Sequence, residues 1–284
     1  MNAPLLSTPR VLPFFFDAER GTRFSLYHAP SPHVAPRGAI LYVHPFAEEL
    51  GKTRRLAALQ SRAFAALGYA VLQIDLFGCG DSCGDFNAGR WEIWKDDLAL
   101  AARWLVERAG GGPLSLWGVR LGGLLALDFA AQVELEQIIL WQPFMSGRAC
   151  INQFLRLRLA ARPEHAAPGA ARSTASLRTQ LAVHGAIEVA GYEVAIPLVK
   201  AIDACDAARI VLPPCTVHWF ASGGPAPSRV AASAARLAER WAPGGVTLHF
   251  HPVPGPDPAW SGEGVVESPE LLEATSAVFA GGAR

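Results

Sequence analysis

The stretch Gly118-Val119-Arg120-Leu121-Gly122 has the glycine spacing of a nucleophile turn. In a Gly-x-Ser-x-Gly turn, the serine stands between a strand and a helix and attacks an ester or amide carbonyl. The flanking residues fit that arrangement, because one apolar run ends at Gly118 and another follows Leu121. The central residue, however, is Arg120. A guanidinium stays protonated and has no usable lone pair, so it cannot be the nucleophile.

The other two members of a serine triad are also missing where chain order would put them. That order is serine, acid and then histidine. After the strand expected at 216–222, residues 221–229 contain no Asp or Glu, and the residue available after the preceding strand is Gln142. After the last strand, residues 254–258 read Pro-Gly-Pro-Asp-Pro. Three separate absences argue against conventional serine hydrolysis, because the triad works as one unit.

Other residues that could serve a reaction have ordinary explanations. His249 and His251 alternate with Phe250 and are expected on one face of a strand. Cys79 has no His or acid placed to activate its thiol. We therefore assign no catalytic residue from these positions.

What remains of a hydrolase pocket predicts an anion site. The loop His44-Pro45-Phe46 stands where an oxyanion loop would be, and the N–H groups of Phe46 and Leu121 would point into the pocket. Leu121 also opens a helix, and helix N-termini favour anions. Arg120 would add a positive charge and five N–H donors, which suit a carboxylate or phosphate.

The alternative for Arg120 is an internal ion pair. Glu48 and Glu49 follow the oxyanion loop and are expected near the turn. Either could neutralise Arg120, since an unpaired buried charge costs several kcal/mol. The two roles can coexist, because a guanidinium has donors to spare.

Three further polar residues are candidates for the pocket. Asp81 lies with Ser82 in the Gly-rich stretch 78–89, either as a possible acid or in a turn that bonds its own backbone. Glu188 and Tyr192 belong to a segment that could cover the pocket from above, or they could begin a solvated helix.

Apolar runs alternate between strand and helix spacing along most of the chain, which is typical of a parallel sheet covered on both faces. We expect one α/β domain over 1–284, with a helical lid inserted at 148–206. Strands are expected in a hairpin at 11–29 and at 38–46, 69–78, 113–118, 135–144, 216–222 and 246–255, and helices at 54–68, 91–110, 121–132, 229–241 and 268–281.

Composition narrows the class of protein. The 284 residues carry 25 basic and 25 acidic side chains, so no overall field favours nucleic acid or a membrane surface. We expect no membrane span, no signal peptide and a cytoplasmic location. The five cysteines are unevenly spaced, which predicts free thiols; we expect no metal and no cofactor.

The order of these parts resembles the α/β-hydrolase superfamily over nearly the whole chain. The features are Val-His-Pro-Phe at 43–46, the Gly- and Asp-rich stretch at 74–86, the turn at 118–122 and the insertion before two last strands. Residues 44–55, 118–123, 187–198 and 267–275 are similar, more narrowly, to the second hydrolase associated with exosortase A (PEP-CTERM) systems. This resemblance implies a setting beside bacterial exopolysaccharide and protein-sorting genes.

Three functions remain open. The first is a hydrolase-family protein with a degenerate triad that binds an anionic or acylated small molecule. The second is an ester or acyl hydrolase in which Glu48, Glu49 or Asp81 activates water while Arg120 and backbone N–H groups hold the oxyanion. The third is a scaffold for a partner enzyme. An unpaired carboxylate facing a water-filled pocket would favour catalysis over the other two.

Overall fold

The chain folds around one eight-stranded sheet. The computed structural model describes residues 10–161, 173–222, 229–254, 260 and 264–280. The strands follow the order β1-β2-β4-β3-β5-β6-β9-β10, and all pairs are parallel except β1–β2 and β2–β4. Their bounds are β1 Val11–Ala18, β2 Gly21–His28, β3 Gly38–Val43, β4 Tyr69–Ile74, β5 Leu114–Val119, β6 Gln137–Trp141, β9 Thr216–Ser222 and β10 Thr247–Val253.

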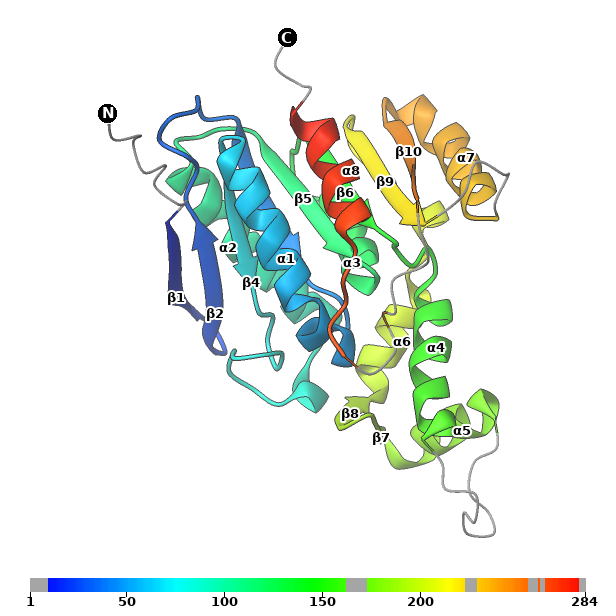
Figure 1. The fold of residues 1–284 in the computed structure, drawn as a ribbon. Coiled ribbons are helices and arrows are strands. Elements are labelled where there is room, and N and C mark those ends of the chain that lie inside the picture. Colours follow the sequence, from blue (N-terminus) through cyan, green and yellow to red (C-terminus); the bar gives the residue numbers. More distant parts are fainter. Residues whose placement is uncertain (1–9, 162–172, 223–228, 255–259, 261–263, 281–284) are drawn as a thin grey trace.

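Helices cover both faces of this sheet (Figure 1). One face packs against α1 (Glu48–Ala66) and α8 (Pro269–Ala280), with Phe64 and Phe279 in a shared apolar cluster. The larger core lies on the other face, under α2 (Trp91–Arg108), α3 (Leu121–Ala130) and α7 (Arg229–Trp241). This is the α/β-hydrolase architecture that the sequence predicts.

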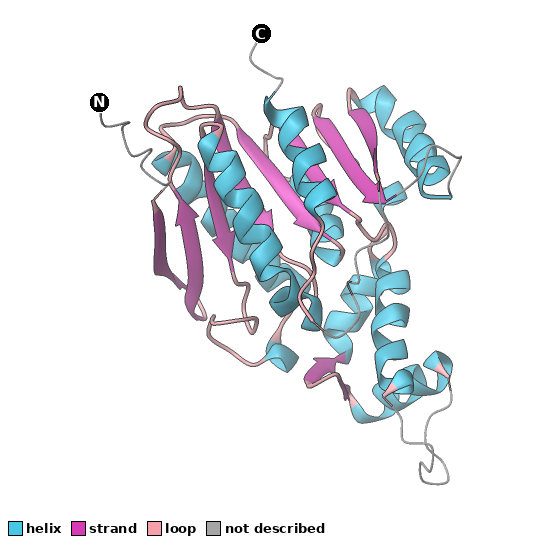
Figure 2. Cartoon of the chain, in the orientation of Figure 1, coloured by secondary structure: helices cyan, strands magenta, loops and turns pink. Residues whose placement is uncertain are grey.

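A separate group of elements stands between β6 and β9 in the chain and lies beyond the carboxyl ends of the strands (Figure 1). It contains α4, α5 and α6 with a two-stranded sheet, β7–β8 (Figure 2). The 3-10 turn η2 follows α6 before β9, and the 3-10 turns η1 and η3 stand elsewhere in the chain. The bounds are α4 Gly147–Ala160, α5 Thr174–His184, β7 Ala186–Val189, β8 Tyr192–Ala195 and α6 Ile196–Ala204, with 3-10 turns η1 Phe86–Ala88, η2 Ala207–Arg209 and η3 Ala242–Gly244.

The sequence analysis misplaced parts of two segments. The first helix begins at Glu48, six residues before the expected start at 54. The insertion holds a hairpin where only helices and loops were expected, so Glu188 and Tyr192 lie on strands and not at a helix start. The hairpin turn is Ala190-Gly191, and both residues have positive φ, at 51° and 82°, as a tight two-residue turn requires.

Two glycines allow the turn after β5 to pack against its neighbours. A Cβ on Gly122 would lie 2.3 Å from the carbonyl oxygens of both Val43 and His44, and one on Gly118 would lie 2.5 Å from the Cα of Gly123. These are backbone atoms at the end of the neighbouring strand β3 and in the turn itself, so they cannot rotate away as a side chain could. The glycines therefore fix how closely α3 approaches the end of β3.

We expect Gly122→Ala to destabilise the fold by about 3 kcal/mol, as overpacking against a rigid backbone does. Gly51→Ala is the matched control, because Gly51 is an exposed residue of α1 whose added Cβ meets nothing within 4 Å. That change should stabilise the fold by about 0.5–1 kcal/mol through helix propensity. Urea midpoints at unchanged slope measure both. Equal midpoints for the two variants would contradict this account of the turn.

Candidate functional site

Arg120 occupies the turn between β5 and α3 in a backbone conformation that side chains rarely adopt. Its φ is 56° and its ψ is −119°. The backbone holds this conformation from both sides: the Arg120 N–H donates to the Trp141 carbonyl at 3.0 Å, and its carbonyl accepts from the N–H groups of Gly123 and Phe144 at 3.1 and 3.2 Å. Strained residues of this kind cluster at functional sites. The turn therefore has the local geometry of a nucleophile position, although its side chain is a guanidinium.

The Arg120 side chain is largely buried and is bound on several sides. Its Nε donates to Glu49 Oε1 at 3.3 Å, and its Nη1 donates to the Gln142 carbonyl at 3.2 Å. The guanidinium carbon lies 4.2 Å from the ring centroid of Phe144 and 5.6 Å from that of Trp260. Nη2 makes no hydrogen bond to a residue that the structure describes. The internal ion pair is thus present, and one nitrogen of the guanidinium is left over.

Of the two acids expected near Arg120, Glu49 makes the contact. Its side chain is 7% exposed, and burial raises the pKa of Glu49 to about 7 against the lowering effect of Arg120. Burial also raises the pKa of Glu48, whose Oε2 is buried without a hydrogen-bond partner among the described residues. Two buried carboxyl groups therefore lie at the start of α1 near Arg120 and Lys52, and Glu49 is the one paired with Arg120.

The loop before α1 is tied to the end of β4 through the His44 ring. His44 Nδ1 lies 2.7 Å from the Pro45 carbonyl, and its Nε2 lies 3.3 Å from the Leu76 N–H. Nδ1 must therefore carry the proton and Nε2 accept, which ties the loop to the end of β4. Among the described residues, no acceptor bonds the backbone N–H of Phe46 or Leu121. Burial lowers the pKa of His44, which keeps the ring neutral.

The space directly over these donors is small. One cavity lined by Phe46, Glu48, Glu49 and Cys150 measures about 10 Å³, and a second, lined by His44 and Leu121, has the same volume. Phe154 of α4 fills the position above, with its ring centroid 5.0 Å from that of Phe46. A volume of this order holds about one water molecule. No organic ligand fits here with α4 in this position.

A larger cavity lies on the other side of Arg120. It measures about 310 Å³ and is formed at the ends of β6 and β9 and the start of α7. Its polar lining residues are Arg120, Gln142, Ser222, Arg229 and Ser233. The sequence analysis missed Arg229 and Ser233, because a single arginine and serine at a helix start give no signal until the sheet order places them beside Arg120.

Asp81 does not reach the turn. Its side chain is 67% exposed and lies 3.7 Å from Arg54, while its N–H donates to Asp75 Oδ2 at 2.9 Å. Ser82 likewise bonds the backbone, since it accepts from the Phe24 N–H at 2.9 Å. The Asp81 side chain therefore lies at the surface beside Arg54, and the Ser82 side chain ties the loop to β2 and to the end of β4.

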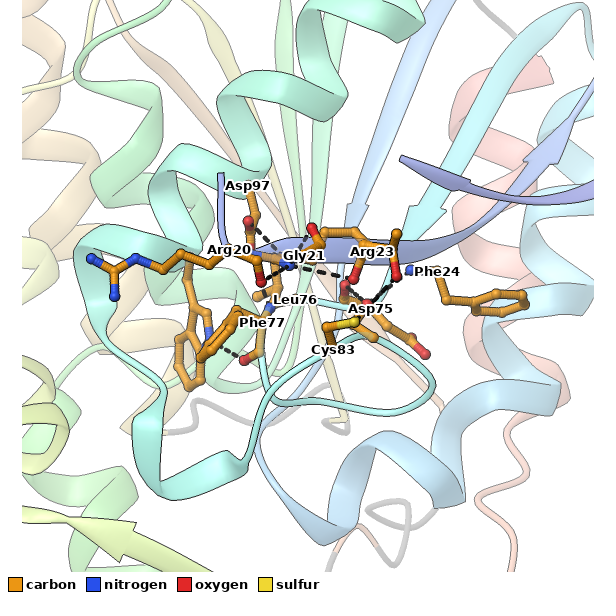
Figure 3. Close-up of polar contacts among 12 residues, drawn as sticks. Arg20, Gly21, Arg23, Phe24, Asp75, Leu76, Phe77, Cys83 and Asp97 are labelled. Carbon is orange, nitrogen blue, oxygen red and sulfur yellow. Dashed lines mark hydrogen bonds and ion pairs between the residues drawn. The ribbon is translucent and has the colours of Figure 1, made fainter. Parts of the chain in front are cut away.

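A buried ion pair fixes the same loop from its other end (Figure 3). Arg23 Nε donates to Asp97 Oδ1 at 2.8 Å, and Asp97 Oδ2 accepts from the Phe77 N–H at 2.8 Å. Arg23 Nη1 also lies within reach of the carbonyls of Arg20 and Gly21, at 3.3 and 3.1 Å. The network joins β2, α2 and the end of β4, and so positions the loop structurally.

Glu188 and Tyr192, the two insertion residues expected over the pocket, do not line the cavities described above. Tyr192 packs on Phe86, with ring centroids 5.0 Å apart, and Glu193 accepts a hydrogen bond from Asn87. Glu188 is exposed, and its carbonyl accepts from Arg158 at 2.7 Å. The hairpin therefore docks on the η1 turn.

The histidines of the last strands form a group of their own. His218 Nδ1 lies 3.0 Å from His251 Nε2, and the ring of His249 stacks 5.4 Å from that of His218. No described contact joins them to Arg120, which fits a place on the sheet face. The expected histidine position at 255–258 and most of the acid position, 223–228, lie outside the described residues.

Neither a metal cluster nor a membrane helix is found in the described part of the chain. No group of three His, Cys, Asp or Glu side chains there could hold a metal ion. None of its helices is long and apolar enough to cross a membrane. Cys79 is buried, and burial raises its pKa, which leaves the thiol protonated and unreactive.

Known proteins match the chain at the level of family and fold. Residues 34–238 match the family described as Hydrolase_4, serine aminopeptidase, S33. Human protein ABHD12B is 27% identical over 166 residues, which is 51% of this chain and 44% of the human protein. The chain thus spans less than half the length of that relative.

Solved structures show the same fold at low identity. Est1E from Butyrivibrio proteoclasticus, solved with ferulic acid bound, superposes with a TM-score of 0.62 at 15% identity, covering 94% of this chain and 96% of Est1E. XC6422 from Xanthomonas campestris, described as a serine hydrolase without a lid, gives 0.55 at 17% identity, with 98% and 94% covered.

The raised pKa of Glu49 predicts a pH-dependent stability. Because the folded pKa of about 7 lies above the unfolded value of 4.5, the folded state binds the Glu49 proton more tightly, and this contribution is lost as pH rises from about 4.5 to about 7. The free energy of unfolding of the wild type, minus that of Glu49→Gln, should fall by about 3 kcal/mol across this window.

Urea unfolding at a series of pH values measures the difference, and Glu193→Gln, an exposed acid of β8, is the control that should show no such slope. A difference that rises with pH would mean that Arg120 holds Glu49 ionised throughout.

Proposed function

Because the chain belongs to the serine aminopeptidase S33 family of α/β hydrolases, we propose that it is a member without a Ser-acid-His triad that binds an anionic or acylated small molecule. One observation carries the proposal: the turn keeps the backbone conformation of a nucleophile position, but Arg120 stands there. A residue that is always protonated can bind and orient an anion or an acyl oxygen, and it cannot form an acyl-enzyme.

The surroundings of Arg120 support binding. The Phe46 and Leu121 N–H groups have no acceptor among the described residues, and Arg120 Nη2 has none either. Such donors stabilise negative charge or a polarised carbonyl. The insertion at 148–206 serves as a lid, since Phe154 of α4 closes the space over the donors and must move before an organic ligand enters there.

The cellular setting belongs to the same proposal. Segments 44–55, 118–123, 187–198 and 267–275 support a role beside exosortase and exopolysaccharide functions, in the cytoplasm. A ligand from such a setting is a carboxylated or phosphorylated sugar or a lipid-linked intermediate, which a guanidinium recognises well. A protein partner in the same system is compatible with this role.

One observation favours a second candidate, an ester or acyl hydrolase that uses Glu49. Burial holds the pKa of Glu49 at about 7, near the value at which a general base works best at neutral pH. Glu49 would activate water while Arg120 and the backbone donors hold the oxyanion. Its contact with Arg120 weighs against this role, because the ion pair occupies the carboxylate.

The test is turnover of short and medium acyl nitrophenyl esters by the purified protein. We expect no turnover above the buffer rate, and none in Arg120→Ser, because a serine alone lacks the base that would activate it.

Arg120→Met should weaken the binding of acylated and anionic compounds by about tenfold, measured by calorimetry. Turnover by the wild type that is lost in both Arg120→Met and Glu49→Gln would establish the second candidate instead.

A further inference from the structure

The 310 Å³ cavity beside Arg120 is built from hydrogen-bond donors and apolar groups, with no carboxylate among its described lining residues. We propose that it binds a small organic anion, a phosphate or carboxylate carried on a short apolar group. This inference rests on the proposed function and places its ligand: between β6, β9 and the start of α7, and not in the water-sized space under α4.

The support for an anion is a pair of cations that line the cavity from different elements. Arg120 comes from the turn after β5, and Arg229 is the first residue of α7. Arg229 makes no ion pair with a described carboxylate, whereas Arg120 shares its charge with Glu49 through Nε only. Two guanidinium groups around one cavity attract an anion, and their planar N–H groups suit carboxylate and phosphate oxygens.

A buried tryptophan forms part of the apolar wall of the same cavity. Trp219 lines the cavity and is 2% exposed, and its Nε1 is buried with no hydrogen-bond partner among the described residues. An indole N–H can only donate, and leaving a buried donor unpaired costs about 1–3 kcal/mol. Because Nε1 is inaccessible to a water molecule, it does not open into the cavity in this structure, and Trp219 contributes its ring to the cavity wall.

The cavity also defines the uncharged part of its ligand. Pro143, Met145, Ala221 and Val230 supply apolar surface, while Ser233 lies one turn along α7 from Arg229 and donates to the Arg229 carbonyl at 2.9 Å. The volume lies at the lower end of the range for small-molecule sites. The cavity therefore fits an anion whose apolar part is about the size of one ring.

The test is calorimetric titration with phenyl phosphate, benzoate and the neutral analogue benzyl alcohol at low ionic strength. We expect saturable binding of at least one anion and none of benzyl alcohol, and the stronger of the two anions identifies the head group. Arg229→Gln should weaken binding by about tenfold. Trp219→Phe, which keeps an aromatic ring in the wall and removes an N–H that does not open into the cavity, should bind the anions as the wild type does.

Arg240→Gln is the matched control, because Arg240 is an exposed arginine in the last turn of the same helix and does not line the cavity. The affinity of Arg240→Gln for phenyl phosphate and benzoate should equal that of the wild type. Thermal melts check that each variant folds. Because Arg229 is exposed, Arg229→Gln should fold and so tests the site even if Trp219→Phe does not fold.

Two results would overturn the cavity site. Binding that is lost in Arg120→Met but unchanged in Arg229→Gln would put the anion at the turn, leaving the proposed function intact. Absence of saturable binding of both anions would exclude the cavity as an anion site, and the proposed function would then rest on acylated ligands alone.

Discussion

Burial of the Arg120 guanidinium is the constraint around which this end of the sheet is arranged. A charge that is 11% exposed must be compensated nearby, and the backbone gives it no freedom to leave, because the turn is held by three hydrogen bonds. Glu49 of α1 and, from the loop after β6, the Gln142 carbonyl and the Phe144 ring supply the compensation. The start of α1, the end of β6 and the turn after β5 are therefore linked through one side chain.

The same constraint explains why α1 begins where it does. Ala47, the residue before the helix, has φ 50° and ψ −123°, nearly the conformation of Arg120 before α3. This turn brings Glu49 into the first turn of α1, close to Arg120, although its burial raises its pKa. Gln142 also has a positive φ, 44°, and places its carbonyl on Nη1. Arg120 and two residues near it, Ala47 and Gln142, thus have positive φ, and strained residues of this kind cluster at functional sites.

The sequence predicted the fold and the part of the site around the turn, but it did not predict the residues on the cavity side of Arg120. Alternating apolar strands and helices, and the Gly118–Gly122 spacing, are local signals, so the sheet, the turn and the closeness of Glu49 to Arg120 followed from them. The β7–β8 hairpin did not, because its four-residue strands are too short to show a period. Trp219 and Arg229 could not be found either, since they meet Arg120 only through the strand order β5-β6-β9, which no local pattern encodes.

Arg120 contacts Glu49 and also lines the 310 Å³ cavity. The protonation of Glu49 and the proposed binding of an anion in the cavity are therefore coupled. When Glu49 is ionised, part of the guanidinium charge is already compensated, and an anion in the cavity gains less from it. When Glu49 takes up a proton, the charge is available to the cavity. By linkage, each event favours the other by the same free energy, so an anion bound beside Arg120 raises the pKa of Glu49. A general base would need the opposite, a carboxylate that stays ionised when ligand binds. The contact through which Glu49 would tune Arg120 for the proposed anion would thus make Glu49 a poor base, which is the physical reason for proposing binding ahead of hydrolysis.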